Sequence, residues 1–447
     1  MRTAALLVAL SACGSSHHHG ADAGGDGTGS AIVDAAPIDV PFVKGTVKVT
    51  VTNASVAQCD PAQLHVVFVD VDQSMTDVIA DAQGKAQADV FPGASATAVC
   101  IRATGTTIAT TVHDVEPGDD LTLDGSYFFN GTKTADQTAA GSMKISFPAA
   151  NGASGYTVET PCGEVGTTQT NNVAMPMKAG CALATMDLVV TTQTQWTEAA
   201  NVAFANNGSV SVTDTWHAMA PITASYSNAP AFCADSASPD YPCDVQLSRY
   251  VPELHGNRTT GMTSLTTSGT VMVTSPTSSS AIMQSRLENM GPAYQVFTDV
   301  VDGSQTTYAI DFAGKSLPWM CLGKPQCPTF SGTDANLTIP VTGTGGYDLF
   351  YADVEYVRGQ QIFWWRVFGP TAGDVTYPPL PAAIASIRPT SADHQSVTHA
   401  RICESDALNG WRAARQNPFD SLATCVQSTN PTAPRYGGTH NRVSASQ

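Results

Sequence analysis

The sequence is poor in charged residues, and poorest in basic ones. Only 13% of its 447 residues are charged, and 21 lysines and arginines stand against 38 aspartates and glutamates, which gives a formal net charge of −17. A nucleic-acid-binding surface needs clustered basic side chains, so we expect no nucleic-acid partner. The same acidity disfavours docking on anionic lipid surfaces through charge.

The short motifs of common enzyme classes are also missing. The chain contains no GxSxG, HExxH, SxxK, GxGxxG, P-loop or EF-hand sequence. Catalytic groups can nevertheless come together from distant parts of a chain, so missing motifs do not exclude an enzyme. We predict a non-catalytic protein without cofactor or metal. The alternative is a secreted hydrolase with a carboxylate or histidine site in the C-terminal half.

Two pairs of residues are the candidates for such a site. Asp353 and Glu355 share one face of a predicted strand, and paired carboxylates serve glycoside hydrolysis. His394 and His399 lie on a predicted loop near Asp393 and Glu404, and histidines with carboxylates bind metals. Solvated polar side chains explain both pairs more simply, and we prefer that interpretation.

The longest apolar run is short and stands at the N-terminus. Arg2 is followed by an apolar stretch from Ala4 to Leu10 and then by Ser11, Ala12 and Cys13. Seven apolar residues are too few to cross a bilayer, which takes roughly 20. A basic residue, an apolar run and small residues together are typical of a secretory signal.

The Leu-Ser-Ala-Cys sequence ending at Cys13 resembles the lipobox of bacterial lipoproteins. The resemblance implies that residues 1–12 are a signal peptide, that the Cys13 thiol carries a diacylglycerol, and that acyl chains such as palmitate attach the protein to a membrane. Gly14 at the next position resembles lipoproteins sorted to the outer membrane. We therefore expect a lipid-anchored protein of the cell envelope, in the outer membrane of a Gram-negative bacterium.

The cysteine count fits this interpretation. Removing Cys13 from the 11 cysteines leaves an even number, as a disulfide framework in an oxidising compartment requires. The sequence contains no CxxC pair, which would favour a metal site. Pairing in sequence order would place one bridge in each predicted folded unit, although the sequence leaves the connectivity open. The candidates are Cys59, Cys100, Cys162, Cys181, Cys233, Cys243, Cys321, Cys327, Cys403 and Cys425.

The remaining pattern predicts an all-β protein of tandem β-sandwich domains after a disordered N-terminal spacer. Residues 13–42 are rich in Gly, Ser, Ala and Asp and predict a flexible spacer. From Val43 the pattern has period two, as in Val47, Val49 and Val51 alternating with polar residues. Residues 43–125 form the first predicted domain.

Part of this first domain has a recognisable sequence. The run DAQGKAQADVFPGASATAV, from Asp81 to Val99, resembles the carboxypeptidase regulatory-like (transthyretin-like) domains. Their repeat is a strand, a D-A-x-G turn, a second strand, and then P-G before a third strand. The resemblance implies a β-sandwich that serves as scaffold or binding module and carries no catalytic residues.

Three further units follow. Residues 140–221 include FPAANGASGYTV, from Phe147 to Val158, which resembles the opening strands of fibronectin type III domains, with Phe147 in place of the usual tryptophan. Residues 222–318 predict a β-rich domain. Residues 328–429 predict a β-sandwich with a C-terminal extension held by Cys403 and Cys425, and residues 430–447 predict a disordered tail.

Adjacent aromatic residues mark the strongest predicted hairpin. Trp364 and Trp365 point to opposite faces of their strand, so we expect one in the core and one outside, near Tyr351. An outward indole can stack on a sugar ring or pack against a neighbouring domain, and we consider the second more common. The sequence thus predicts a surface-anchored structural, adhesive or binding protein. Its partners are the membrane, through the lipid anchor, and a cell-surface polysaccharide or protein.

Overall fold

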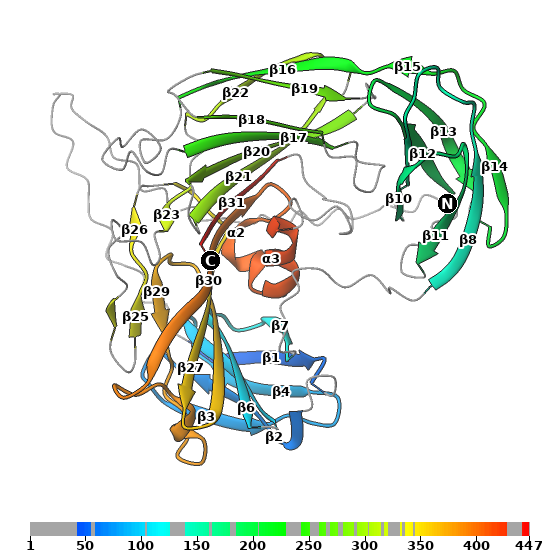
Figure 1. Ribbon diagram of the computed structural model, residues 1–447. Helices are drawn as coiled ribbons and strands as arrows, with labels where there is room; N and C mark the ends of the chain where they lie inside the picture. The colour runs from blue at the N-terminus through cyan, green and yellow to red at the C-terminus, as the bar shows by residue number, and fades with distance from the viewer. Residues whose placement is uncertain are drawn as a thin grey trace, which may run out of the picture. The chain divides into compact units, whose positions relative to one another are not determined.

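The computed structural model (Figure 1) describes most of the chain beyond residue 42. The described residues are 43–54, 59–102, 105–125, 139–160, 163–178, 185–203, 205–228, 243–250, 259–264, 269–275, 280–289, 293–302, 304–313, 317–320, 331–332, 336–342, 345–426 and 440–446. The predicted signal peptide, Cys13 and the predicted spacer lie outside them. Almost all regular structure is β-strand, so the predicted all-β class is confirmed.

The first predicted domain is a sandwich of two layers. One layer is a three-stranded sheet with β1 (Gly45–Thr52) between β4 (Lys85–Val90) and β7 (Asp120–Asp124). The other contains β2 (Cys59–Val69), β3 (Met75–Ile79), β5 (Ala94–Arg102) and β6 (Thr106–Val115). The predicted alternation in β1 holds, because Val47, Val49 and Val51 are all buried while their neighbours are not.

Residues 139–218 form a second sandwich with a core of its own. Its five-stranded sheet has the order β10 (Gly163–Thr168), β9 (Tyr156–Thr160), β12 (Thr185–Thr191), β13 (Gln195–Ala203), β15 (His217–Ala218). The facing sheet has the order β11 (Asn172–Lys178), β8 (Ala139–Ser146), β14 (Ser209–Ser211). Met143, Ile145, Val158, Leu188 and Val190 fill the space between them.

The third predicted unit contributes to two sheets. A three-stranded sheet has β16 (Ala220–Ser227) between β19 (Gly269–Ser275) and β22 (Thr307–Asp311). The other strands are β17 (Cys243–Tyr250), β18 (Thr259–Ser264), β20 (Ser280–Asn289) and β21 (Ala293–Asp302). They pair antiparallel in the order β18-β17-β20-β21 and form one end of a 12-stranded sheet.

The C-terminal part is built on a long hairpin. Strands β27 (Leu349–Arg358) and β28 (Gln361–Gly369) pair in the register that the alternation predicts, and β30 (His394–Ser405) pairs with the other edge of β27. The short elements around them are β23 (Trp319–Met320), β24 (Ser331–Gly332), β25 (Asn336–Thr338), β26 (Val341–Thr342), β29 (Asp374–Thr376), η2 (Ala385–Ile387), α2 (Gly410–Ala414) and α3 (Pro418–Val426).

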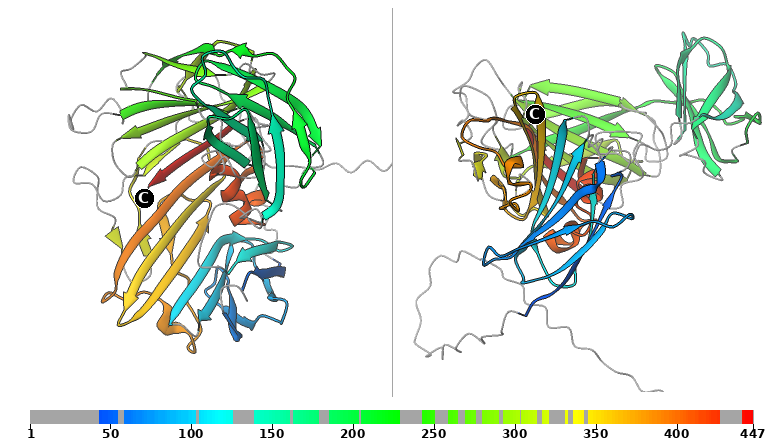
Figure 2. Two further views of the ribbon diagram at one scale, coloured as in Figure 1. Left: turned by 45° about the vertical axis from the view of Figure 1, so that its right-hand side comes forward. Right: turned by 90° about the horizontal axis from the view of Figure 1, so that it is seen from below.

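The first and last predicted domains are joined in one sheet, which the sequence did not indicate. Strand β28 pairs in parallel with β6, from Ile362 opposite Thr106 to Phe368 opposite Val112. The resulting 12-stranded sheet has the order β18-β17-β20-β21-β31-β30-β27-β28-β6-β5-β2-β3 (Figures 1 and 2). One core cluster accordingly mixes Val47, Val66 and Leu121 of the first domain with Tyr351 and Leu422 of the last.

The C-terminal tail corrects a second expectation. Residues 430–447 were predicted to be disordered, but His440–Ser446 form strand β31, which lies between β21 and β30 and pairs with both. A strand with partners on both edges gains two ladders of backbone hydrogen bonds, which do not depend on a strongly apolar sequence. Among the described residues, no helix is long and apolar enough to span a membrane.

Candidate functional site

A group of charged and aromatic side chains shares one face of strands β27, β28 and β30. Alternation along β27 puts Tyr351, Asp353 and Glu355 on the same side of the sheet. Cross-strand pairing adds Arg366 opposite Asp353 and Trp364 opposite Glu355 on β28. On β30, His399 pairs with Asp353 and Arg401 with Tyr351. We call these seven residues the β27 face.

This face changes from covered to open along the strands. On β27 the exposed fraction rises from 1% at Tyr351 through 7% at Asp353 to 48% at Val357. On β28 it rises from 1% at Arg366 to 36% at Ile362. Glu355 and Trp364 are half-buried between these extremes.

Asp353 is the most perturbed carboxyl group of the face. Burial raises its pKa to about 6, although the Arg366 guanidinium and the Tyr351 hydroxyl beside it act in the opposite direction. Its Oδ1 atom is buried and accepts no hydrogen bond from the part of the chain that the structure describes. A buried oxygen in this state normally costs about 1–3 kcal/mol.

The other ionisable groups of the face are less exposed to water than usual. Burial lowers the pKa of the His399 imidazole, and the positive charge of Arg401 lowers it further. Burial raises the pKa of the Tyr351 hydroxyl, as does the charge of Asp353. Both groups are therefore neutral near pH 7, so the charges of the face are those of two carboxylates and two arginines.

Arg366 connects the β27 face to the first domain. Its Nη1 atom donates to the backbone oxygen of Asp124, at the end of β7, over 3.4 Å. Its guanidinium carbon lies 5.5 Å from the centre of the Phe419 ring on α3. The closed end of the face is thus formed where β7, β28 and α3 meet.

The predicted aromatic binding surface is not formed as expected. Tyr351 is buried against Phe368, with ring centres 4.9 Å apart. Trp365 is fully buried on the opposite face, where its Nε1 donates to Thr111 Oγ1 over 2.9 Å. Side chains of the first domain and of α3 pack on one face of this part of the sheet, and side chains such as Leu337, Leu380 and Ile387 pack on the other. Trp364 is half-buried and packs against the core cluster that the first and last domains share.

Two of the predicted disulfides are present, and both follow sequence order. Cys59 bonds to Cys100 across neighbouring strands β2 and β5, and Cys403 on β30 bonds to Cys425 on α3. The other candidates lie outside the described residues, namely Cys162, Cys181, Cys233, Cys321 and Cys327, together with the side chain of Cys243. Their pairing stays a prediction.

The fold does not bring His394, His399 and Asp393 together as a metal site. His394 and His399 lie on β30, a strand rather than the predicted loop. The nearby Asp393 is held by Arg358, whose Nε donates to its Oδ1 over 3.0 Å, and this lowers the Asp393 pKa. Among the described residues, no group of three histidines, cysteines or carboxylates could hold a metal ion.

A buried ion-pair cluster fixes the C-terminal helices on the first domain. The Arg415 side chain is 2% exposed and places Nε 2.8 Å from Asp119 Oδ2. Its Nη2 donates to Glu116 Oε2 over 2.9 Å, and its Nη1 donates to the Asp114 backbone oxygen over 2.8 Å. Gln416 adds hydrogen bonds to the same loop. This cluster is structural, since every polar group of Arg415 is directed at the loop between β6 and β7.

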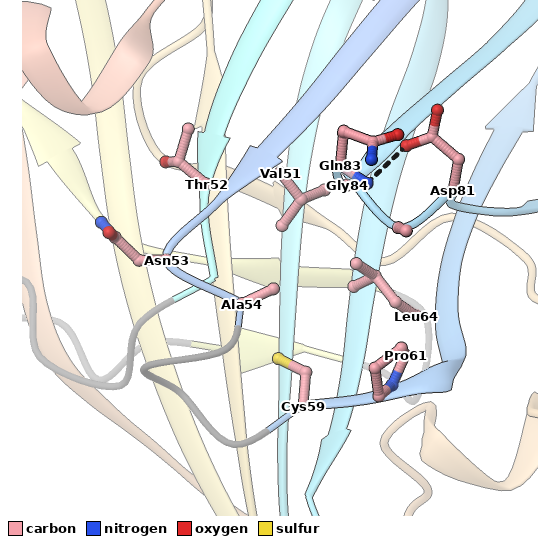
Figure 3. A pocket seen from close by; sticks show the side chains of 11 residues that line it. Val51, Thr52, Asn53, Ala54, Cys59, Pro61, Leu64, Asp81, Gln83 and Gly84 are labelled. Carbon is pink, nitrogen blue, oxygen red and sulfur yellow. Dashed lines mark hydrogen bonds between the residues drawn. The ribbon is translucent and has the colours of Figure 1, made fainter.

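A cavity of about 350 Å³ lies at one end of the first sandwich, beside the disulfide of Cys59 (Figure 3). Its lining is mostly apolar, with Val51, Ala54 and Leu64 among the contributors. The Asp81 carboxylate is already used, because its Oδ1 accepts from the backbone N–H groups of Gln83 and Lys85. The Thr52 hydroxyl and the Asn53 amide are also used within the chain, because they donate to Leu123 O and Asp124 Oδ1 of β7.

Sequence reasoning identified the carboxylates and Trp364 of the β27 face but missed its basic side. Arg366 and Arg401 stand on strands where alternation assigns them to the same face as Asp353, so the register of the predicted hairpin could have revealed Arg366. Arg415 gave no such signal, because its partners lie about 300 residues away in the sequence.

Comparisons with known proteins leave the chain without an assigned family. No protein-family model matches it, and no curated protein matches it. Similar solved structures include the Bacillus anthracis TIE protein, at 11% identity and a TM-score of 0.14, with 60% of this chain and 50% of that protein covered. The chain thus spans about half the length of that protein.

Two candidate adhesins from Bacteroides ovatus are also similar. One is 10% identical, with a TM-score of 0.16 and with 68% of this chain and 100% of that chain covered. The other is 8% identical, with a TM-score of 0.13 and with 74% and 97% covered. TM-scores this low carry no functional conclusion, so function has to be argued from the residues of this chain.

Proposed function

We propose that the chain is a surface-anchored, non-catalytic lipoprotein with a structural, adhesive or binding role. Residues 1–12 are its signal peptide, Cys13 its lipidated residue and residues 13–42 its spacer. The folded part comprises the β-rich units 43–125, 140–221, 222–318 and 328–429. Its place is the cell envelope, lipid-anchored in the outer membrane of a Gram-negative bacterium, with a cell-surface polysaccharide or protein as partner.

The observation that carries this proposal is the pair of disulfides within the β-sheet body. Cys59–Cys100 and Cys403–Cys425 each cross-link neighbouring elements of one body, as expected of a protein that folds in an oxidising compartment. These bridges use four of the 11 cysteines, and if the remaining candidates pair in sequence order as predicted, Cys13 in the Leu-Ser-Ala-Cys sequence is left without a disulfide role. Export and lipidation account for both facts together.

A Cys13→Ser variant tests the anchor. We expect it to lose incorporation of labelled palmitate, to keep its signal peptide and to leave the membrane fraction. The matched control is the double variant Cys403→Ser/Cys425→Ser, which removes two cysteines but leaves the predicted lipobox intact, and which should still be labelled. Lipid labelling of the Cys13→Ser chain would contradict the proposal.

One observation favours the hydrolase alternative. Asp353, with a pKa of about 6, lies two residues from Glu355 on one strand face, and a pair of neighbouring carboxyl groups is the arrangement of glycosidases. In that case Asp353 would act as the general acid and Glu355 as nucleophile or base. Hydrolysis of an oligosaccharide that is abolished by both Asp353→Asn and Glu355→Gln would establish the alternative.

A further inference from the structure

We infer that the β27 face binds a neutral, hydroxyl-rich ligand, a carbohydrate, with Trp364 and Glu355 at the open end and Asp353 and Arg366 at the buried end. This inference rests on the binding role proposed above and names the ligand class and the residues. It replaces the expected surface of Tyr351, Trp364 and Trp365, of which only Trp364 is accessible.

The charges of the face select a neutral ligand. Asp353 and Glu355 contribute two negative charges, and Arg366 and Arg401 contribute two positive charges on the facing strands. An anionic ligand would meet both carboxylates, and a cation would compete with two arginines for them. Because the four charges balance within one face, a ligand without net charge fits it best.

The hydrogen-bonding groups of the face select hydroxyls. Ionised carboxylates only accept hydrogen bonds, whereas guanidinium groups and the indole Nε1 only donate them. On β27 and β28 the two kinds of group stand opposite each other where Asp353 faces Arg366. A hydroxyl group donates and accepts at once, so one hydroxyl can bond to a carboxylate and to a guanidinium group.

A second observation that points to a ligand is the buried carboxylate oxygen of Asp353. The residue is 7% exposed, and its Oδ1 atom accepts no hydrogen bond from the described part of the chain. Buried carboxylate oxygens are normally hydrogen-bonded, and one that is not has a specific explanation. A ligand hydroxyl that enters from the open end of the face would donate to this oxygen and remove the cost of its burial.

The open end has the apolar surface that a sugar ring requires. Val357 and Ile362 are 48% and 36% exposed, and the half-buried Trp364 lies between Ile362 and Arg366 on the same face of β28. Sugar rings carry C–H groups on their faces and hydroxyls on their edges. A ring seated on Trp364 would therefore direct its hydroxyls toward Glu355 and Asp353.

The test uses the full lipid-anchored chain in a detergent without a sugar head group. The probes are maltohexaose, cellohexaose and laminarihexaose, with tri-galacturonate as the anionic comparison, and binding is followed by titration calorimetry. We expect saturable binding of at least one neutral probe. Trp364→Ala and Glu355→Gln should each weaken it by at least about tenfold, which corresponds to about 1.4 kcal/mol.

Two matched variants control for general effects of the substitutions. Trp216→Phe changes a half-buried tryptophan of the separate 139–218 sandwich, and Glu198→Gln changes an exposed strand carboxylate there. Both should bind the probe as the unmodified chain does. Circular dichroism melting of every variant establishes that it is folded before its affinity is compared.

Three results would overturn the inference. They are no saturable binding of any neutral probe, tighter binding of tri-galacturonate than of every neutral probe, and equal binding by the Trp364→Ala and unmodified chains. Each leaves the lipid labelling of Cys13 untouched, so failure of this site and failure of the proposed anchor are separate outcomes. Cleavage of a bound probe would support the site but favour the hydrolase over the non-catalytic function.

Discussion

The 139–218 sandwich and the body formed by residues 45–124 and 345–426 differ in how far apart in the sequence their core residues lie. The core of the first is made of residues between Met143 and Trp216, so its folding depends on local sequence. The core of the second combines residues near Val47 with residues near Leu422. Two β-sandwich patterns that look alike in the sequence therefore differ in whether each is complete by itself.

The two bodies differ because the edge strand β6 of the first domain pairs with β28 of the last. In the joined body, β6 has β5 on one side and β28 on the other, and Trp365 of β28 donates to Thr111 of β6 across a separation of 254 residues. A free β6 would leave an unpaired edge and an uncovered apolar face. Residues 43–125 therefore share their sheet and part of their core with residues 345–426.

Fragments should show the largest contrast. We expect residues 139–221 to fold alone, with a cooperative thermal transition, because their core is local. Residues 43–125 alone should aggregate or melt without cooperativity, since Val67, Val99 and Ala109 lose the residues that cover them. Adding residues 345–447 as a separate chain should restore a cooperative transition. A cooperative melt of 43–125 alone, equal to that of the full chain, would contradict this comparison.

The next largest effect should follow loss of the buried ion pairs. Arg415→Met leaves Asp119 buried at 5% exposure without its main cationic partner, and breaking a buried pair from one side typically costs about 3–5 kcal/mol. Denaturant unfolding should lose this amount in the transition of the joined body and nothing in that of the 139–218 sandwich.

Arg412→Met is the matched control for this prediction. Arg412 is 79% exposed and lies 3.7 Å from Glu116, so its loss should change the free energy of unfolding by less than about 1 kcal/mol. Equal effects of the two substitutions would mean that burial of Arg415 does not matter.

Removal of a disulfide should rank third. Cys403→Ala/Cys425→Ala opens a loop of 22 residues, and in the chain-entropy account this costs about 3 kcal/mol. The same change at Cys59 and Cys100, which are 41 residues apart, should cost about 0.5 kcal/mol more. Denaturant unfolding under oxidising conditions measures both, and the reverse order would show that local packing outweighs loop length.

The smallest expected effect comes from Asp353, whose ionisation makes the folded chain less stable as the pH rises. The Asp353 pKa is raised to about 6 in the folded chain from an ordinary value of 3.8, so the folded state holds its proton more tightly than the unfolded state. Stability should therefore fall as the pH rises from about 4 to about 6, by an amount on the order of 2 kcal/mol. Groups facing Asp353 are Glu355 on its own strand, Arg366 on β28, and His399 and Arg401 on β30.

Asp353→Asn should remove this dependence. We expect the variant to match the unmodified chain near pH 4 and to be more stable by about 2 kcal/mol at pH 7, since the amide does not ionise. Urea unfolding at both pH values measures the difference. A variant that is less stable at pH 7 would show that the Asp353 charge contributes more through Arg366 than burial costs.

The sequence predicted local structure well because period-two alternation reports directly on strands. The β27–β28 hairpin, the turn after Asp81 and the strands that start the 139–218 sandwich are all present. It failed at the parallel β6–β28 pair and at β31, because alternation says which side of a strand is buried but not which strand lies beside it.

The candidate site shows the same limit. Asp353, Glu355 and Trp364 could be named in advance, because they stand out within one hairpin. Their burial could not, since it depends on elements such as α3 and β7 that pack from elsewhere in the chain. Arg401 joins the site through β30, about 50 residues after Asp353, which periodicity does not register.

The parallel pair of β6 with β28 also sets an order of events when the chain is made. Synthesis begins at the N-terminus, so β6 exists long before its partner, and the first sandwich waits with an open strand edge while roughly 250 more residues are added. During that interval another chain can add a strand at the same edge. We therefore expect a holding chaperone that covers β6 until β28 is made to increase the yield of folded protein.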